Sequence, residues 1–253
     1  RMGGLVAPRV RFRGHDLHAQ LRDADWLDVW LLGLTGRRFE PAQLRLLQAL
    51  WVVTSYPDAR IWNNRVVGLA GSARSTGGLA FAAGCAISEA HIYGRGIEMQ
   101  AVDFFLRTRR SVDAGVALED CVAAEIALHG RVAGYGRPLL EADERIEPFM
   151  ALARELGLHE GPHLRLAGEV EAVLRASGKP LRMNYGAIVC SIAADLGFTA
   201  RQFTLFMFPA FLAGMGPCYV EATERPEGTL FPLPVSHLRF DGREPRRWTD
   251  RER

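Results

Sequence analysis

The stretch HGRVAGYGRPLLEADER, residues 129–145, guides the interpretation of the rest of the chain. At its centre, residues 134–138 read Gly-Tyr-Gly-Arg-Pro, a glycine-rich turn that presents one long side chain. Because glycine adopts positive φ and lets a ligand approach the backbone closely, Arg137 is expected to point into a cavity. Arg145 follows at the start of a helix predicted over residues 146–156. Two guanidinium groups beside exposed backbone amides suit an anionic substrate, since arginine binds carboxylates bidentately.

A second interpretation fits the same residues. A surface turn before a helix also contains glycine and proline, and its arginines would simply be solvated. The stretch alone therefore leaves a ligand site and a surface turn as open alternatives.

Length, charge and cysteine content limit the possible classes of function. A chain of 253 residues suits one large domain or two closely joined ones. Its 31 basic and 29 acidic residues give a formal net charge of +2, which argues against a general nucleic-acid role. Four widely spaced cysteines form no Cys-x-x-Cys pair, so neither a metal site nor a disulfide framework is predicted. With no secretory signal in the sequence, a reducing cytoplasmic location is expected.

One segment raises the question of a membrane span. Residues 203–220 carry no formal charge over 18 positions, which is just long enough to cross a bilayer. Pro209, Gly214, Gly216 and Pro217 interrupt the segment. We therefore expect a buried core helix, broken near its C-terminal end, and no membrane partner.

Hydrophobic periodicity predicts a mainly α fold. Strand-like alternation is nearly absent apart from a weak patch at residues 235–240, and residues 11–23 are expected to form a turn that leads into a short helix. Between residues 64 and 90, small residues at three- and four-residue steps predict two buried helices, and Thr199 is expected to cap the apolar segment. Further helices are predicted at residues 24–34, 42–53, 96–107, 112–129, 146–157, 162–177 and 184–196.

Short motifs follow one another in a distinctive order. They are VRFRGHDL at 10–17, AAG at 82–84 with YGRGIE at 93–98, GYGRP at 134–138 with DER at 143–145, and MNYGAI at 183–188 with DLG at 195–197. In order and spacing they resemble the citrate synthase superfamily, most closely its short bacterial citryl-CoA-lyase-like members. The resemblance covers nearly the whole chain, from about residue 10 to the C-terminus.

The resemblance implies a fold, a division into domains and an oligomer. The fold would be all-α and citrate synthase-like, with residues 1–106 and 198–253 forming a large domain and residues 107–197 a small one. The active site would lie in the cleft between the domains. A homodimer is implied, with the second subunit contributing to the site.

The resemblance also implies a reaction. In that family an aspartate takes a proton from acetyl-CoA, one histidine holds the resulting enol, a second polarises the ketone of oxaloacetate, and arginines hold the carboxylates. A thioester α-carbon is a weak acid, so the reaction needs a positioned base and a donor where enolate charge develops.

This chain departs from the family pattern at the groups that handle protons. The resemblance places Tyr93 and Arg137 at the two histidine positions, Tyr185 at the aspartate base and Phe211 at a late arginine, whereas Arg145 keeps the family identity. A phenol has an ordinary pKa of about 10, and arginine stays protonated. We therefore expect the two arginines to hold anions and a tyrosine to donate a hydrogen bond or shuttle a proton. Citrate formation from oxaloacetate is not expected.

Secondary candidates each have a structural alternative. His91 could supply an imidazole or cap a helix end, and Arg246 or its neighbour could replace an arginine that the family donates across the dimer. Asp58 could be a base or a turn residue. Asn63 and the residue after it could bind a ligand or cap a helix.

Substrate and co-substrate contacts complete the predicted site. Asn184 and Phe211 are expected to contact the substrate. The resemblance implies that the backbone of the turn binds a CoA thioester co-substrate, with no tightly bound cofactor. The turn residues concerned are Val132, Ala133, Gly134, Tyr135 and Gly136.

Three functions remain open at this point. The first is an enzyme of the acyltransferase or lyase type that makes or breaks a carbon–carbon bond next to a thioester or carboxylate, on a substrate other than oxaloacetate. The second is an enzyme of another reaction type, such as hydrolysis, decarboxylation or cyclisation in specialised metabolism. The third is a non-catalytic acyl-CoA-binding homologue.

Overall fold

The structure is a computed structural model that describes residues 3–6, 9–89, 94–136, 143–179, 181–230, 234–237, 239 and 241–242. Over these residues the chain is predominantly helical, so the mainly α fold is confirmed. The helices are α1 Trp26–Thr35, α2 Pro41–Thr54, α3 Trp62–Ser72, α4 Gly77–Ile87, α5 Arg95–Asp113, α6 Leu118–His129, α7 Ile146–Glu155, α8 Pro162–Ala176, α9 Tyr185–Asp195 and α10 Ala200–Glu224, with a 3-10 helix at Val235–His237.

The N-terminal residues form a small antiparallel sheet, so the helix predicted within residues 11–23 is wrong. Strand β1 (Gly3–Val6) pairs with β2 (Arg9–Phe12), which pairs with β3 (His15–Asp16). The β2–β3 loop has two residues, Arg13 with φ 51° and Gly14 with φ 89°. Two successive positive φ values match the twist of the flanking strands, which is why this short hairpin closes.

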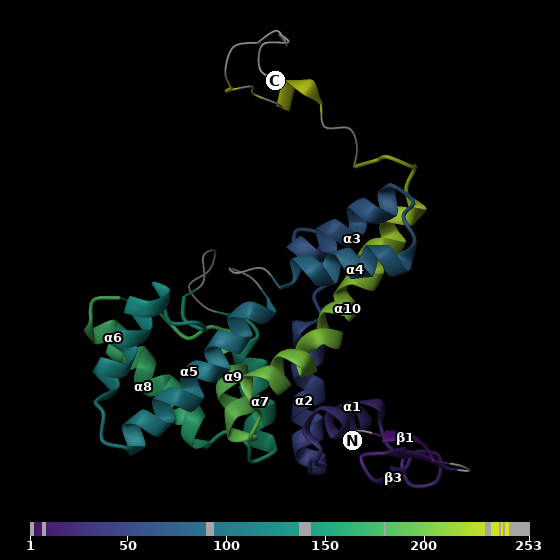
Figure 1. The fold of residues 1–253 in the computed structure, drawn as a ribbon. Coiled ribbons are helices and arrows are strands. Elements are labelled where there is room, and N and C mark those ends of the chain that lie inside the picture. The colour runs from purple at the N-terminus through teal and green to yellow at the C-terminus, as the bar shows by residue number, and fades with distance from the viewer. Residues whose placement is uncertain are drawn as a thin grey trace, which may run out of the picture.

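Helix α10 is the central helix of the fold. It packs against α1, α2, α3, α4 and α5 (Figure 1). Its predicted cap is confirmed, because the Thr199 hydroxyl accepts a hydrogen bond from Gln202 N at 3.2 Å. The predicted break is wrong, since the helix continues through Pro209 and Pro217 to Glu224.

Among the described residues, α10 is also the one helix long and apolar enough to cross a membrane. Its most apolar 18-residue window has a mean hydropathy of 1.5, and 39% of that window is buried. A core helix passes the same test, and the packing of five helices around α10 favours a core helix.

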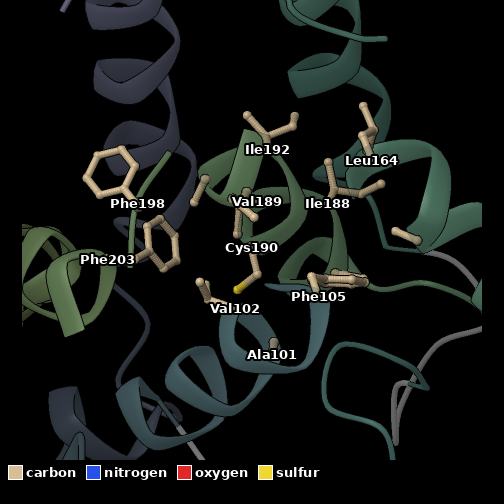
Figure 2. Packing of buried hydrophobic residues seen from close by; sticks show 14 of the residues in the cluster. Ala101, Val102, Phe105, Leu164, Ile188, Val189, Cys190, Ile192, Phe198 and Phe203 are labelled. Atoms are coloured by element: carbon tan, nitrogen blue, oxygen red, sulfur yellow. The ribbon is translucent and has the colours of Figure 1, made fainter. Parts of the chain in front are cut away.

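The main core lies where α9 packs between α5, α8 and the start of α10. Helix α9, predicted as a helix over residues 184–196, is buried over almost its whole length. Figure 2 shows Cys190 and Val189 of α9 facing Val102 of α5 and Phe203 of α10. Each of these four side chains is at most 2% exposed. This core fixes the position at which α9 begins.

Helices α3 and α4 pack on the C-terminal half of α10 and form an arm of the molecule (Figure 1). Their small residues permit close helix contact, because a Cβ on Gly84 would lie 2.5 Å from the Val67 side chain. The expectation that both helices are buried is wrong for α4. Its outer face is exposed, with Leu79 67% accessible.

The predicted domain boundary falls inside a helix. Residues 106 and 107 both lie in α5, which contacts α6, α8 and α9 as well as α10. The division into domains 1–106, 107–197 and 198–253 remains a prediction.

Candidate active site

A cavity of about 340 Å³ opens where α3, α5, α9 and α10 meet the glycine turn. Its volume lies at the lower end of ordinary ligand pockets, which span about 300–1,000 Å³. The polar lining consists of Thr54, Tyr56, Asn63, Asn64, Glu98, Asp143, Arg145, Asn184 and Tyr185. The apolar lining consists of Ile61, Ile97, Val189, Met207, Ala210 and Phe211, with glycines at 94, 136, 186 and 214.

The glycine turn is fixed to the chain just before α9. Gly134 and Gly136 have φ values of 93° and 82°, as expected for a turn that needs glycine. Gly134 O accepts a hydrogen bond from Asn184 N at 2.9 Å, and Gly136 N donates to Arg182 O at 2.8 Å. The turn therefore borders the cleft as a rigid backbone segment.

Asn184 holds this turn with its own side chain. Its Nδ2 donates to Gly136 O at 2.8 Å, and its Oδ1 accepts from Gly186 N at 2.8 Å, which caps α9. Both polar atoms are thus used within the chain. The geometry gives Asn184 a positioning role where a substrate contact was expected.

The side chains of the turn point into the protein. Val132, Ala133 and Tyr135 are 2%, 4% and 8% exposed. The phenol of Tyr135 donates to Ala167 O at 2.8 Å, and burial raises its pKa. A ligand at this turn would therefore meet backbone groups.

Arg145 lies beside a buried carboxylate at the edge of the cleft. Its Nε and Nη2 donate to the two carboxylate oxygens of Asp143 at 2.8 and 2.7 Å. The Asp143 side chain is 1% exposed and also accepts from Tyr185 N at 2.9 Å. Burial would raise the pKa of Asp143, but the hydrogen bonds from Arg145 and Tyr185 N outweigh it and lower that pKa to about 2.

Two aromatic rings flank the same guanidinium. The Arg145 Cζ lies 4.8 Å from the ring centroid of Tyr185 and 5.9 Å from that of Tyr56. Distances within about 6 Å are typical of cation–π contact. The Tyr56 hydroxyl in turn bonds Glu144 Oε1 at 3.1 Å. The Asp143 carboxylate and the two tyrosine rings together fix the position of the Arg145 guanidinium.

Tyr185 lines the cleft, but its phenol is directed into the core. The residue is 3% exposed, and its hydroxyl donates a long hydrogen bond of 3.5 Å to Leu50 O of α2. Burial is the largest cause that raises its pKa above the ordinary value. The charge of Arg145 acts to lower this pKa, but burial outweighs it, and a neutral phenol cannot serve as a base near pH 7.

The loop between α2 and α3 is held by side chains that the sequence analysis weighed. Asn64 Nδ2 donates to the carbonyls of Tyr56 and Asp58 at 2.6 and 3.0 Å. The Asp58 carboxylate is held bidentately by Arg60 at 2.7–3.1 Å on the surface. This geometry matches the turn interpretation of Asp58.

Four predicted site residues, Tyr93, His91, Arg137 and Arg246, lie outside the described residues. The glycines next to the first and third of them, Gly94 and Gly136, both line the cleft. Among the residues that the structure does describe, no group of three or more His, Cys, Asp or Glu side chains could hold a metal ion.

Two cleft residues were missed from the sequence. Neither Tyr56 nor Glu98 was predicted as a site residue, although both line the cavity. The one available signal was the YGRGIE motif, because Glu98 lies in the first turn of α5, a few residues after Gly94.

This all-α fold is shared with solved structures of a citryl-CoA lyase and of citrate synthases. The chain is similar to the citryl-CoA lyase of Hydrogenobacter thermophilus, with a TM-score of 0.85 and 20% identity over 99% of this chain and 97% of that one. The fold implied by the resemblance is confirmed.

Two further structures share the fold over part of their length. An ATP citrate lyase variant from Methanosaeta concilii, in complex with (3S)-citryl-CoA, has a TM-score of 0.71 and 15% identity over 99% of this chain and 42% of that one. A citrate synthase from Thermoplasma acidophilum, in complex with carboxymethyl coenzyme A and oxaloacetate, has a TM-score of 0.68 and 15% identity over 91% and 61%. No protein-family model and no curated protein sequence matches the chain.

Proposed function

We propose that the chain is a citrate synthase-like enzyme that makes or breaks a carbon–carbon bond next to a CoA thioester, on a substrate other than oxaloacetate. The observation that carries the proposal is the cleft, where a rigid glycine turn borders a half-buried and oriented arginine. The similar structures include a citryl-CoA lyase and complexes with citryl-CoA or a CoA analogue. These ligands support a CoA thioester as the co-substrate.

The charge of the cleft supports the choice of a different substrate. Among the described lining residues, Arg145 contributes one positive charge, while Asp143 and Glu98 contribute two negative ones. One positive and two negative groups sum to −1. Oxaloacetate carries two carboxylates, and such a lining would repel the second.

Each group in the proposed site has a physical role. Arg145 holds an anionic group, and the backbone of residues 132–136 contacts the thioester arm. Tyr93 and Arg137, next to Gly94 and Gly136, are proposed to donate hydrogen bonds and to hold an anionic group of the CoA co-substrate. Tyr185 positions Asp143 through its backbone N–H and stacks on Arg145.

The test follows free CoA thiol in the direction of condensation and acetyl-CoA in the direction of cleavage. With acetyl-CoA and oxaloacetate, or with citryl-CoA, we expect turnover lower than that of a citrate synthase by about 100-fold or more, since oriented acid–base groups contribute 10²–10⁴-fold. With CoA alone, the melting temperature should rise, because a ligand that binds only the native state stabilises it. Rapid citrate formation, or no response to CoA, would refute the proposal.

The raised pKa of Tyr185 favours the two alternative functions. A cleft without a titrating tyrosine at this position fits a non-catalytic acyl-CoA-binding homologue or another reaction type. Stabilisation by acyl-CoA thioesters without turnover of any tested pair would select the binding protein.

We further propose a homodimer through the outer face of α4. This face is exposed and wholly apolar, formed by Gly78, Leu79, Ala82, Ala83 and Ala86. Small residues of this kind permit close helix packing, and exposed apolar patches mark interaction surfaces.

Leu79→Asp is therefore expected to yield monomers. Burying an unpaired carboxylate in an apolar interface is costly, so the dimer dissociation constant should increase by about 100-fold or more. Light scattering coupled to gel filtration measures the change. Leu128→Asp is the matched control, because Leu128 is 71% exposed on α6, and it should leave the mass unchanged. Equal masses for both variants would exclude this face.

A further inference from the structure

The α10 side of the cleft is apolar. Met207, Ala210, Phe211 and Gly214 line the cavity. Their spacing of three, four and seven residues places them on one face of the helix. Phe211 also packs against both buried clusters of the protein, so its ring is supported from behind. A carboxylate on this side would lose its hydration with no partner, whereas an alkyl group would gain from burial.

A buried amide offers one hydrogen bond to the cavity. Asn63 is 2% exposed and lines the cleft. Its Oδ1 accepts from Asn64 N at 2.9 Å. Because a backbone N–H can only donate, this contact fixes which end of the amide is oxygen. The Nδ2 end has no hydrogen-bond partner among the residues that the structure describes. A donor that lines a cavity and has no partner in the described protein is suited to an oxygen of a ligand.

We infer that the cleft takes a 2-oxo acid with a single carboxylate and an apolar substituent. The carboxylate lies toward Arg145, the 2-oxo oxygen accepts a hydrogen bond from Asn63 Nδ2, and the substituent packs on Phe211. This inference rests on the proposed function, because it names the substrate class of that same cleft.

The inferred substrate gives a balanced reaction. In condensation the thioester α-carbon loses a proton, a bond forms between that carbon and the 2-oxo carbon, and the oxo oxygen gains a proton. The product is a 2-hydroxy acid that still carries the CoA thioester, and its cleavage is the reverse reaction. Hydrolysis of that thioester by water releases free CoA thiol, and no step needs an oxidant or reductant. Asn63 would donate to the oxygen on which negative charge develops.

Binding of a series of 2-oxo acids to the whole protein tests the inference. We expect 4-methyl-2-oxopentanoate and 3-methyl-2-oxobutanoate to bind more tightly than 2-oxobutyrate, by about fourfold per buried methylene, and oxaloacetate to bind most weakly. Calorimetry gives the dissociation constants. Binding of no 2-oxo acid, or tightest binding of oxaloacetate, would overturn the inference.

Variants of Phe211 and Asn63 test whether these two residues cause the preference for apolar 2-oxo acids. Phe211→Arg should reverse the order in favour of oxaloacetate by about tenfold or more, since it adds a partner for a second carboxylate. Leu205→Arg is the control on the same helix, because Leu205 is 40% exposed and does not line the cavity. Asn63→Asp keeps the oxygen that accepts from Asn64 N but removes the donor, and should weaken binding about tenfold or more. If Phe211→Arg does not fold, Phe211→Ala tests the same point. It should reduce the increase in affinity that each methylene of the 2-oxo acid gives.

The outcomes separate this inference from the proposed function. Apolar 2-oxo acids that bind in the expected order, but support no thiol release with any CoA thioester, would retain the inference and refute the function. Condensation of a CoA thioester with a dicarboxylic 2-oxo acid other than oxaloacetate, in preference to the apolar 2-oxo acids, would retain the function and refute the inference. An order of binding that neither Phe211 variant changes would overturn the inference alone.

Discussion

Asp143→Ala is expected to lower the free energy of unfolding by about 3 kcal/mol or more. The substitution breaks an ion pair whose carboxylate is 1% exposed and leaves the Arg145 guanidinium, 25% exposed, without that partner. Breaking a buried pair in this way costs about 3–5 kcal/mol. Tyr185 N loses its acceptor as well, so the start of α9 is released. Urea unfolding followed by circular dichroism measures the change.

The chain offers a matched control for this variant. Asp58 and Arg60 form the same Asp-x-Arg pair with the same bidentate geometry, but on the surface. Asp58→Ala should change stability little, because exposed pairs contribute little in water. Equal losses for the two variants would mean that burial of the Asp143 pair contributes nothing.

The pH dependence of Asp143→Ala follows from the lowered pKa. Its carboxyl has a pKa of about 2 in the folded chain, against an ordinary value of 3.8. Because the folded pKa is the lower one, the charged form is stabilised on folding. This contribution is complete above about pH 4 and is lost as the pH falls toward 2. The stability difference between parent and variant should therefore shrink over that interval, and a constant difference would contradict the assignment.

The helical part of the fold could be predicted because its signals are local. Thr199 with Gln202 caps α10, and Pro41 opens α2, as the residue types alone indicate. The hairpin at Arg13 could not be predicted, since a non-glycine residue at positive φ leaves no pattern in the sequence. The continuity of α10 past Pro209 depends on five packed helices, which is tertiary information.

The candidate site also has features that local sequence signals predict and features that depend on tertiary structure. The glycine turn, Asn184, Tyr185 and Phe211 all meet at the cleft, as the motifs predicted. The ionisation of Tyr185 could not be predicted, because its phenol is buried against Leu50 of α2, 135 residues away. Burial of a side chain by a distant segment is a property of the fold, and it decides here which protonation state is available.

Gly134→Ala is expected to destabilise the protein by about 3 kcal/mol and to abolish CoA-dependent stabilisation. Gly134 has a φ of 93°, where an alanine is strained by about 1–2 kcal/mol. Its Cβ would also lie 2.9 Å from Ala187 N and Cα, which are backbone atoms of α9 that cannot move aside. Overpacking of this kind adds about 1–3 kcal/mol. Thermal and urea unfolding measure the loss.

Gly130→Ala isolates the steric part of that effect. Gly130 has a comparable φ of 72°, but a Cβ there would have no neighbour within 4 Å. Both substitutions restrict the unfolded chain equally, so this contribution cancels between them. Gly130→Ala should therefore lose only about 1 kcal/mol and keep its response to CoA. If Gly134→Ala were no worse than its control, close packing of the turn on α9 could not be what shapes the cleft, and the proposed CoA contact at this turn would fail with it.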